Sequence, residues 1–441
     1  MKLLEVLIAC FIFSVVSGAL SLLLFSSQSF LEWAETRRFA LAFANELMEE
    51  ASDPAHIIDG AYTADVVIKK VDNFTNKKEV RVSYVYRNRP QEIILFVFET
   101  NVVESKGQSS CRPTQDISKW SNPEIRSFDI STIVQSIKPT DIDVVGTYVF
   151  ISSNSSAASS SDLYIFDIRD TQNVRLVSTI DTGPGLASLS VAGDYVYLAN
   201  TSVNGQLQIV DVSDLSTPYL VSTYKLPGGY NDATVGNSIF YKEGKVFLGT
   251  QKSQINELHH IDVSDPAHPH EKGAYEIGNA INDIFVFKDK VYVASPHSDE
   301  MKSFTLSQSG AFIPFASYNN PGSTGNGKRL SLFLDTLYVG KTQTFAREEL
   351  LALQASSSPA LLFGRRLGSS VEGVIGYGSL LFIILHRTSD NFQVFNIVSN
   401  VPSKINNTQT IPANPLNFDC DQDTFVVISE NSTLLTFIKQ R

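Results

Sequence analysis

Residues 208–224 read QIVDVSDLSTPYLVSTY, and this stretch decides the fold. Two short runs rich in β-branched and aromatic residues flank the polar turn sequence SDLSTP, which is typical of two strands joined by a tight connection. The strand part recurs along the chain. Related copies stand at residues 163–168, 207–212 and 261–266, a degenerate copy at 392–397, and weaker copies at 301–306 and 350–353.

A second unit, a short apolar-aromatic strand, also repeats. Its copies stand at residues 148–151, 195–198, 246–248, 291–293, 337–339, 381–383 and 425–427. Successive copies are about 44 to 51 residues apart, close to the period of a four-stranded propeller blade. The seven copies therefore predict an all-β propeller of seven blades over residues 123–441.

The ring can be closed by pairing the two ends of this region. The C-terminus supplies three strands of the last blade, near residues 417–420, 425–428 and 434–438. The missing fourth strand can come from residues 125–130 or from residues 133–138. Such closure removes the exposed edges that an open array of strands would carry.

Two stretches connect this region to a known family. The sequences QIVDVSDLSTPYLVSTY at 208–224 and HIDVSDPAHPHEKGAY at 260–275 resemble the LVIVD-repeat β-propellers, a family of bacterial and archaeal surface proteins. The match is strong in two blades and fades in the others, over roughly the last 320 residues.

The chain opens on an apolar stretch that is long enough to cross a bilayer. Between residues 3 and 25 the only charged residue is Glu5, and a membrane-spanning helix needs roughly 20 apolar residues. No proline or glycine interrupts the second half of the stretch before Pro54, and its apolar residues recur at helical spacing. We therefore expect one helix over residues 1–53, with a transmembrane part at 1–25; an ordinary signal anchor is the plainer alternative.

This opening resembles the N-terminus of type IV pilins and pseudopilins through LLEVLIA at residues 3–9. It departs from the family at Lys2 and in having no proline near position 22. The resemblance implies that Met1 is the processed, N-methylated first residue. It also implies that Glu5 meets the N-terminal amine of a neighbouring subunit in a filament.

Three strands are expected after this helix, at residues 62–71, 79–86 and 92–102. A small antiparallel sheet needs a cover, and the amphipathic half of the helix can supply one, as in a pilin head. The predicted fold class is thus an α+β pilin-like module followed by an all-β, seven-bladed propeller. Its predicted segments are the helix at 1–53, the sheet at 54–103, a polar linker at 104–122 and the propeller at 123–441.

Charge and cysteine content limit the classes of function. The formal net charge is −11, and the absence of any run of Lys or Arg gives no reason to expect nucleic-acid binding. Of the three cysteines, Cys10 lies in the apolar stretch. Cys111 and Cys420 lie in the polar part, and such a pair in an exported protein suggests one disulfide; two free buried thiols are the alternative.

Four histidines form the densest group of potential metal ligands: His259, His260, His268 and His270. His268 and His270 fall in the turn sequence SDPAHPH between blade strands, and no Cys or carboxylate pattern completes a zinc site. The expectation is a solvated turn and no metal.

Two groups of aspartates invite a similar question. The DCDQD sequence at residues 419–423 has alternating aspartates, but the Gly and distal Glu of a helix-loop-helix calcium loop are missing, so we expect a hairpin turn. Asp167, Asp211 and Asp262 recur with the repeat and are expected to make structural hydrogen bonds within their blades.

The sequence as a whole predicts a structural subunit of a type IV pilus-like filament, which polymerises through its N-terminal helix and displays the propeller for adhesion or binding. Expected partners are pilins, prepilin peptidase, the pilus assembly machinery and an unknown propeller ligand. The protein would lie in the cytoplasmic membrane before assembly and be extracellular afterwards. The alternative is a membrane-anchored surface propeller that binds or senses without polymerising. No catalytic residue or cofactor is expected, so the protein is not predicted to be an enzyme.

Overall fold

The structure, a computed structural model, describes residues 40, 44, 55–59, 62–70, 75–86, 89–100, 111–134, 137–154, 161–227, 234–320, 326–333, 335–343, 347–398, 401–430 and 432–441. The chain divides into two compact units, residues 1–100 and 101–441. The described residues of the first unit form one four-stranded sheet, and those of the second form seven.

The sheet of the first unit is an antiparallel meander in chain order. Its strands are β1 (Ala55–Asp59), β2 (Tyr62–Lys70), β3 (Thr75–Tyr86) and β4 (Arg89–Thr100). The three predicted strands are confirmed as β2, β3 and β4, and β1 is an addition. On β3 the side chains of Val80, Val82 and Tyr84 are buried while those of Arg81 and Val85 are exposed, which is the alternation that a one-sided sheet requires.

The predicted α+β class is corrected by this composition. Apart from the short 3-10 turns Ile117–Trp120 and Ile130–Thr132, the named elements of the described residues are strands. Ala40 and Ala44 are helical and pack on the buried face of the meander; the remainder of the predicted helix at 1–53 and the predicted span at 1–25 lie outside the described residues. In the part of the chain that the structure describes, no helix is long and apolar enough to cross a bilayer. Apolar periodicity indicates that one face of a segment is buried, but it does not identify the protein family to which the segment belongs.

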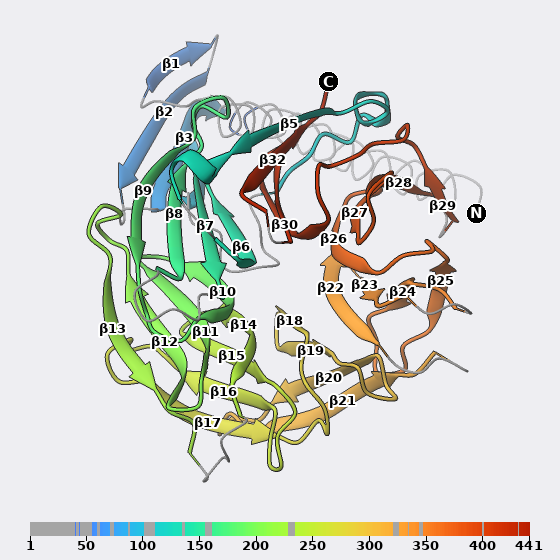
Figure 1. The fold of residues 1–441 in the computed structure, drawn as a ribbon. Coiled ribbons are helices and arrows are strands. Elements are labelled where there is room, and N and C mark those ends of the chain that lie inside the picture. The colour runs from blue at the N-terminus through green and yellow to red at the C-terminus, as the bar shows by residue number, and fades with distance from the viewer. Residues whose placement is uncertain are drawn as a thin grey trace, which may run out of the picture. The chain divides into compact units, whose positions relative to one another are not determined.

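The described residues of the second unit form a ring of seven antiparallel sheets, the architecture of a seven-bladed β-propeller (Figure 1). Blades 1 to 3 consist of β6 (Pro139–Val145), β7 (Tyr148–Ser153), β8 (Leu163–Asp167) and β9 (Arg175–Ile180); β10 (Leu186–Ala192), β11 (Tyr195–Ser202), β12 (Gly205–Asp211) and β13 (Tyr219–Tyr224); and β14 (Gly236–Lys242), β15 (Lys245–Thr250), β16 (Leu258–Asp262) and β17 (His270–Tyr275). Blades 4 and 5 consist of β18 (Asp283–Phe287), β19 (Lys290–Ala294), β20 (Met301–Leu306) and β21 (Phe312–Tyr318); and β22 (Gly327–Phe333), β23 (Thr336–Lys341), β24 (Leu350–Gln354) and β25 (Leu361–Arg365). Blade 6 consists of β26 (Val371–Tyr377), β27 (Leu380–Leu385), β28 (Phe392–Val398) and β29 (Val401–Lys404).

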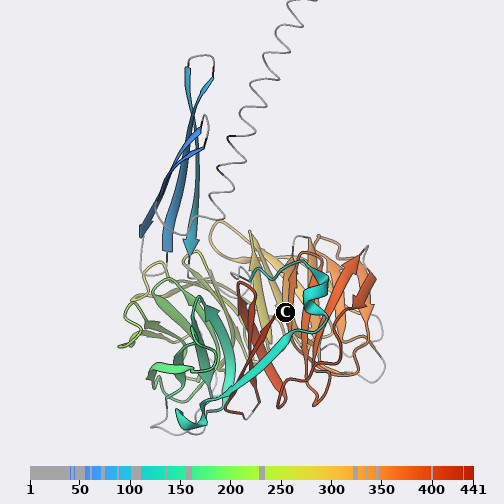
Figure 2. The ribbon, with the colours of Figure 1, turned by 90° about the horizontal axis from the view of Figure 1, so that it is seen from above.

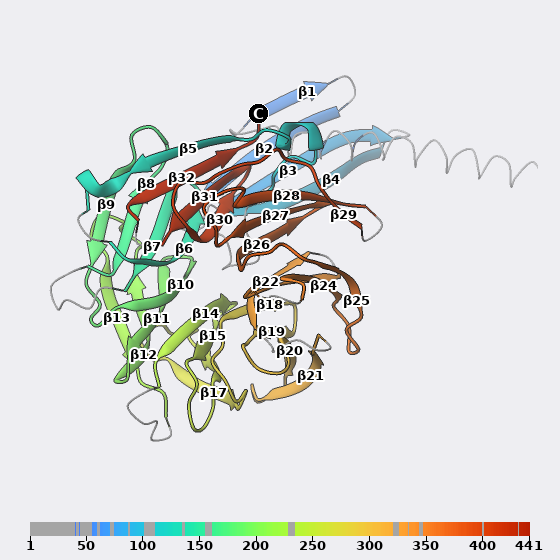
Figure 3. The same cartoon turned by 45° about the vertical axis from the view of Figure 1, so that its right-hand side comes forward.

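Blade 7 joins the two ends of the propeller. It consists of β30 (Pro415–Asp421), β31 (Thr424–Ser429), β32 (Leu434–Lys439) and, as its fourth strand, β5 (Glu124–Asp129). Strand β5 pairs antiparallel with β32, so that Ile125 is opposite Ile438 and Arg126 is opposite Phe437. Figures 2 and 3 show β5 running beside the C-terminal strands. Of the two closing strands that the sequence allowed, the first is the one used.

The apolar cores lie between neighbouring blades. One cluster, for example, joins Ile209 of blade 2 to Ile239 and Leu248 of blade 3. The second strand of each blade is largely buried, because both of its faces pack against a neighbour; Val149, Val196 and Val246 have no more than 1% of their surface exposed. This explains why the short apolar-aromatic strand was the clearest repeat in the sequence.

One type of buried hydrogen bond, which the sequence did not predict, recurs in six blades. A buried side chain at or directly before the third strand accepts a hydrogen bond from the backbone amide that follows the fourth strand. We call these residues the capping acceptors; they are Asp162, Gln206, Glu257, Glu300, Glu349 and Asn391. They satisfy backbone donors that would otherwise be buried without a partner.

The aspartates of the repeat make the structural hydrogen bonds that were predicted. Each accepts from the backbone amide two residues later, at the turn into the fourth strand. The pairs are Asp167 with Arg169, Asp211 with Ser213 and Asp262 with Ser264, at 3.0, 2.8 and 3.0 Å. Hydrogen bonds from the Ser264 hydroxyl and amide lower the pKa of Asp262 to about 2, so this turn keeps its charged acceptor in mildly acidic solution.

Replacing the capping acceptor Asp162 by Asn should increase stability at pH 8. Burial raises the pKa of Asp162 to about 6, in spite of hydrogen bonds from the Thr182 amide and hydroxyl. A folded-state pKa above the unfolded value means that the group stabilises fully below about pH 4 and that this contribution is lost as pH rises through 6. Asn keeps the acceptor oxygen without the charge, so we expect Asp162→Asn to gain about 1 kcal/mol at pH 8 and nothing at pH 4, by urea unfolding.

The reciprocal control is Asn391→Asp in blade 6. It places a carboxylate at the equivalent position, where Asn391 accepts from the Ile411 amide at 2.6 Å. Stability at pH 8 should fall. Equal pH profiles for wild type and Asp162→Asn would show that burial of the Asp162 charge is not what sets the profile.

Candidate functional site

The first strand of every blade lies nearest the centre of the ring (Figure 1). We call the space that these strands line the channel; residues on or next to all seven line a cavity there. In six blades the first strand begins with a β-bulge, which skips one residue in the pairing with the second strand. A bulge turns the side chain of the extra residue out of the regular alternation. The six bulge residues and Asn282, which precedes β18, form what we call the mouth ring: Thr140, Ala187, Asn237, Asn282, Lys328, Glu372 and Leu416.

The next residue of each strand forms a second ring, one step deeper in the channel. Its members, the inner ring, are Asp141, Ser188, Ser238, Asp283, Arg329, Gly373 and Asn417. All but one of these residues are polar. Two rings of side chains therefore converge on one opening, although their members are separated by about 45 residues along the chain.

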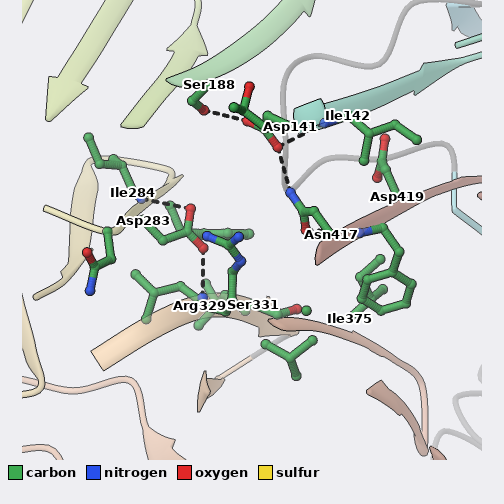
Figure 4. A pocket seen from close by; sticks show the side chains of 18 of the residues that line it. Asp141, Ile142, Ser188, Asp283, Ile284, Arg329, Ser331, Ile375, Asn417 and Asp419 are labelled. Carbon is green, nitrogen blue, oxygen red and sulfur yellow. Dashed lines mark hydrogen bonds between the residues drawn. The ribbon is translucent and has the colours of Figure 1, made fainter. Parts of the chain in front are cut away.

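Two cavities follow these rings. A deep cavity of about 130 Å³ is lined by most of the inner ring, including Asp141, Asp283 and Arg329 (Figure 4). A wider cavity of about 640 Å³ is lined by much of the mouth ring together with Lys138 and Glu430. Arg329 and Asn282 are among the residues that line both, so the two cavities form one continuous site.

Hydrogen bonds between neighbouring blades fix the polar side chains of the channel. The Asp141 carboxylate accepts from the Leu189 amide of blade 2 at 3.1 Å and from the Asn417 side chain of blade 7 at 2.5 Å. The carboxylate of Asp283 accepts from the Leu330 amide of blade 5 at 2.9 Å. These bonds hold the side chains in place before any ligand arrives.

One layer deeper, four side chains continue the same pattern. Each accepts from a backbone amide on the channel strand of the next blade. The pairs are Asp143 with Val191, Ser190 with Tyr241, Ser331 with Gly376 and Asp419 with Val144, at 2.8, 3.3, 3.1 and 2.8 Å. The channel strands are thus joined to one another by side chains rather than by a sheet.

Blade 6 departs from this pattern because its inner-ring residue is Gly373. A Cβ atom at this position would collide with the ring of Phe418 on blade 7. The close approach leaves no room for a polar side chain, so the contact between blades 6 and 7 depends on apolar packing.

The segment of residues 111–122, inside the predicted linker, packs across blades 6 and 7. Cys111 forms a disulfide bond with Cys420 of β30, and their Cα atoms are 5.1 Å apart. The Trp120 ring is fully buried and lies edge-on to Phe382 of blade 6 and Phe425 of blade 7, with centroids 4.8 and 5.7 Å away. The segment therefore reinforces the contact between blades 6 and 7, where the inner ring contributes Gly373 instead of a polar side chain.

The charged groups at the mouth differ in how they are balanced. Lys328 lies 2.5 Å from the Glu372 carboxylate, which is 2% exposed, and burial lowers the pKa of Lys328 despite this partner. Arg329 donates from Nε to the Glu372 carbonyl at 2.7 Å and from Nη2 to the Leu416 carbonyl at 3.5 Å. Arg329 is thus anchored by backbone of blades 6 and 7, with no carboxylate partner among the described residues.

The four histidines do not form one group in space. His259 and His260 lie on β16 and are buried, while His268 and His270 are exposed. The prediction of a solvated turn, made for His268 and His270, agrees with their exposure. Burial lowers the pKa of His260, whose Nδ1 lies 2.9 Å from the Gly310 carbonyl. Side chains on both faces of strand β16 pack against neighbouring elements. The turn sequence that follows the strand did not indicate this burial.

The other predicted sites can be placed more briefly. Of the alternating aspartates, Asp419 lies in the channel. Burial, together with the nearby charge of Asp419, raises the pKa of Asp421 to about 7. Among the described residues no group of three or more His, Cys, Asp or Glu side chains is placed to hold a metal ion. Met1 and Glu5 lie outside the described residues.

The comparisons with known proteins agree with this geometry. The family described as LVIVD repeat matches residues 186–225 and 253–277, which include the strands of blade 2 and the last two strands of blade 3. The chain therefore carries LVIVD repeats within a propeller-like fold. No curated protein matches the chain.

Solved structures resemble the propeller in fold alone. A chain from the "Crystal Structure of Mitotic Checkpoint Complex" has a TM-score of 0.54 and 15% identity, over 72% of this chain and 94% of that chain. The computationally designed Ika8 protein gives a TM-score of 0.47 at 9% identity, over 70% of this chain and 97% of that chain. BamB from Moraxella catarrhalis gives 0.46 at 12% identity, over 87% of this chain and 96% of that chain.

The resemblance to type IV pilins is wrong on these findings. The family match lies wholly within the propeller, and the named elements among the described residues of 1–100 are strands. Neither result supports polymerisation, an N-methylated Met1 or a filament role for Glu5. The error arose because LLEVLIA and an apolar run are a short pattern, whereas the repeat extends through several blades.

Removing the disulfide should lower the free energy of unfolding of the propeller without changing the arrangement of the channel strands. The bond joins residues 309 positions apart, and loss of such a cross-link costs about 2 to 4 kcal/mol. We expect Cys111→Ser to lose that amount in urea unfolding of oxidised protein. Cys420→Ser and the double variant should match it, since all three remove one bond. Wild type that loses nothing on addition of reductant would contradict this role.

Proposed function

We propose that this protein is a surface binding module that takes its ligand at the mouth of the propeller channel and performs no chemistry there. One observation carries the proposal: polar side chains from all but one of the blades converge on a single opening and are held by hydrogen bonds between blades. A preorganised, mostly polar hollow on a rigid scaffold suits ligand recognition.

The state of the channel carboxylates favours binding over catalysis. Asp141 accepts from the Ile142 and Leu189 amides and the Asn417 side chain, and Asp283 accepts from the Ile284 and Leu330 amides. A carboxylate whose oxygens already accept from backbone donors is poorly suited to take a proton from a substrate. These groups shape the channel and stabilise the ring.

Two features support a place outside the cytosol. The buried Cys111–Cys420 bond belongs to the kind of disulfide that persists in oxidising compartments. The apolar run at residues 3–25 is the part of the sequence that favours attachment to a membrane. Both are consistent with a propeller displayed at the cell surface.

Surface display is tested by protease treatment of intact cells that produce the full chain. An antibody to the propeller should label untreated cells, and the label should fall after treatment while a cytosolic marker stays intact. Propeller that becomes accessible only after lysis would place the module inside the cell and defeat this part of the proposal.

Filling the mouth should abolish binding while leaving the fold intact. Ala187 belongs to the mouth ring and lines both cavities, so Ala187→Trp places an indole in the opening. We expect compounds that raise the melting temperature of wild type, from a set of sugars, organic acids, peptides and cations, to have no effect on the variant. Its own melting temperature should stay within a few degrees. If no compound distinguishes the two proteins, the mouth is not the binding site.

A further inference from the structure

We propose that the ligand carries a carboxylate group and that the Arg329 guanidinium binds it. This inference deepens the proposed function and rests on it. It concerns the sector of the channel formed by blade 5, where the mouth ring and the inner ring each contribute a cation, Lys328 and Arg329.

The two cations are not equivalent. The charge of Lys328 is balanced by Glu372. The Lys328 Nζ lies 2.6 and 2.5 Å from the two carboxylate oxygens of Glu372. Arg329 has only backbone carbonyl partners among the described residues, at Nε and Nη2. A guanidinium has five N–H donors, so Nη1 keeps both of its donors and Nη2 keeps one. The open donors belong to a side chain that lines both cavities.

The anchoring of Arg329 makes this a built site rather than a mobile surface charge. Its two acceptors are the carbonyls of Glu372 on blade 6 and Leu416 on blade 7, so one side chain from blade 5 spans three blades. Fixing one edge of the planar fork aims the remaining donors and removes part of the entropic cost of binding. Carboxylates match the fork because they accept two parallel hydrogen bonds.

Carboxylates of the protein in the same cavity do not neutralise this donor set by direct contact. Asp283, Asp141 and Asp419 line the deep cavity, and each accepts from a backbone amide of a neighbouring blade, at 2.9, 3.1 and 2.8 Å. Those amides offset their charge locally. Their presence also limits the ligand, because a dense polyanion would be repelled while a single carboxylate beside polar groups would not.

The size and lining of the site narrow the class further. The deep cavity of about 130 Å³ is similar to the ~150 Å³ cavity that holds a benzene ring, so it admits a carboxylate with a few neighbouring carbon atoms. The wider cavity adds hydroxyl and amide side chains, among them Thr140, Asn282 and Gln251. A polar, hydroxyl-bearing molecule with one acidic group fits both parts, and an acidic sugar and a small organic acid share the chemistry that matters.

The test is calorimetry on the full chain with glucuronate, glucose and succinate as probes. Glucuronate should bind and glucose, which lacks the carboxylate, should not. Binding of succinate as well would make the carboxylate sufficient; failure of succinate alone would add the sugar hydroxyls to the recognition. Both results support the inference. Equal binding of glucose and glucuronate, or no binding of any probe, would overturn it.

Variants separate contact with Arg329 from general attraction. Arg329→Gln should weaken glucuronate binding at least about tenfold, and Arg329→Lys, which keeps the charge without the fork, should also weaken it. The matched control is Lys225→Gln, because Lys225 is an exposed cation that lines neither cavity; it should change affinity less than about threefold. Melting temperatures establish that each variant is folded, and Arg329→Lys carries the test if Arg329→Gln is not.

Failure of this inference can be told apart from failure of the proposed function. If Arg329→Gln binds glucuronate as wild type does, the carboxylate contact is wrong. If other compounds raise the melting temperature of wild type but not that of Ala187→Trp, the mouth remains the binding site, and its ligand belongs to a different class. Glucuronate binding that is unchanged in Ala187→Trp would remove both.

Discussion

The propeller depends on one pairing, that of β5 with β32. Each blade buries its two faces against its neighbours, so an unclosed ring would leave the outer faces of the first and last blades in water, together with an unpaired strand edge. Pairing Ile125 with Ile438 and Arg126 with Phe437 completes blade 7 from the two ends of the propeller sequence. Because this contact joins residues more than 300 positions apart, it carries a large entropic cost of closure.

Two features beside this pairing offset that cost. The Cys111–Cys420 disulfide holds the segment before β5 against β30 and limits the separation of the two ends in the unfolded chain. Trp120 then packs on Phe382 and Phe425 at the contact between blades 6 and 7, where the inner-ring residue is Gly373. The covalent cross-link and the buried Trp120 ring thus occur at the same place in the ring.

Buried polar groups are arranged differently in the blades and in the channel. The capping acceptors work within a blade, and their side chains vary between Asp, Gln, Glu and Asn because the position requires only an oxygen that accepts a hydrogen bond. Glu300 also forms a fully buried ion pair with Lys341 of the next blade, at 2.7 Å. In the channel the same kind of acceptor points to the neighbouring blade, and the few donors left over, those of Arg329 above all, face the cavity.

The sequence by itself determined the blades, since the apolar-aromatic strand near Val149, Val196 and Val246 records burial on both faces, and it determined the turn aspartates, because their partners lie two residues away. It also narrowed the closing strand to two candidates. It misled at the N-terminus, where an apolar run was assigned to a family. Only the tertiary structure decided the site. A bulge displaces one residue in each of six blades. Lys328, Arg329 and Asn282 acquire a shared role when seven distant strands meet around one channel, which no local pattern encodes.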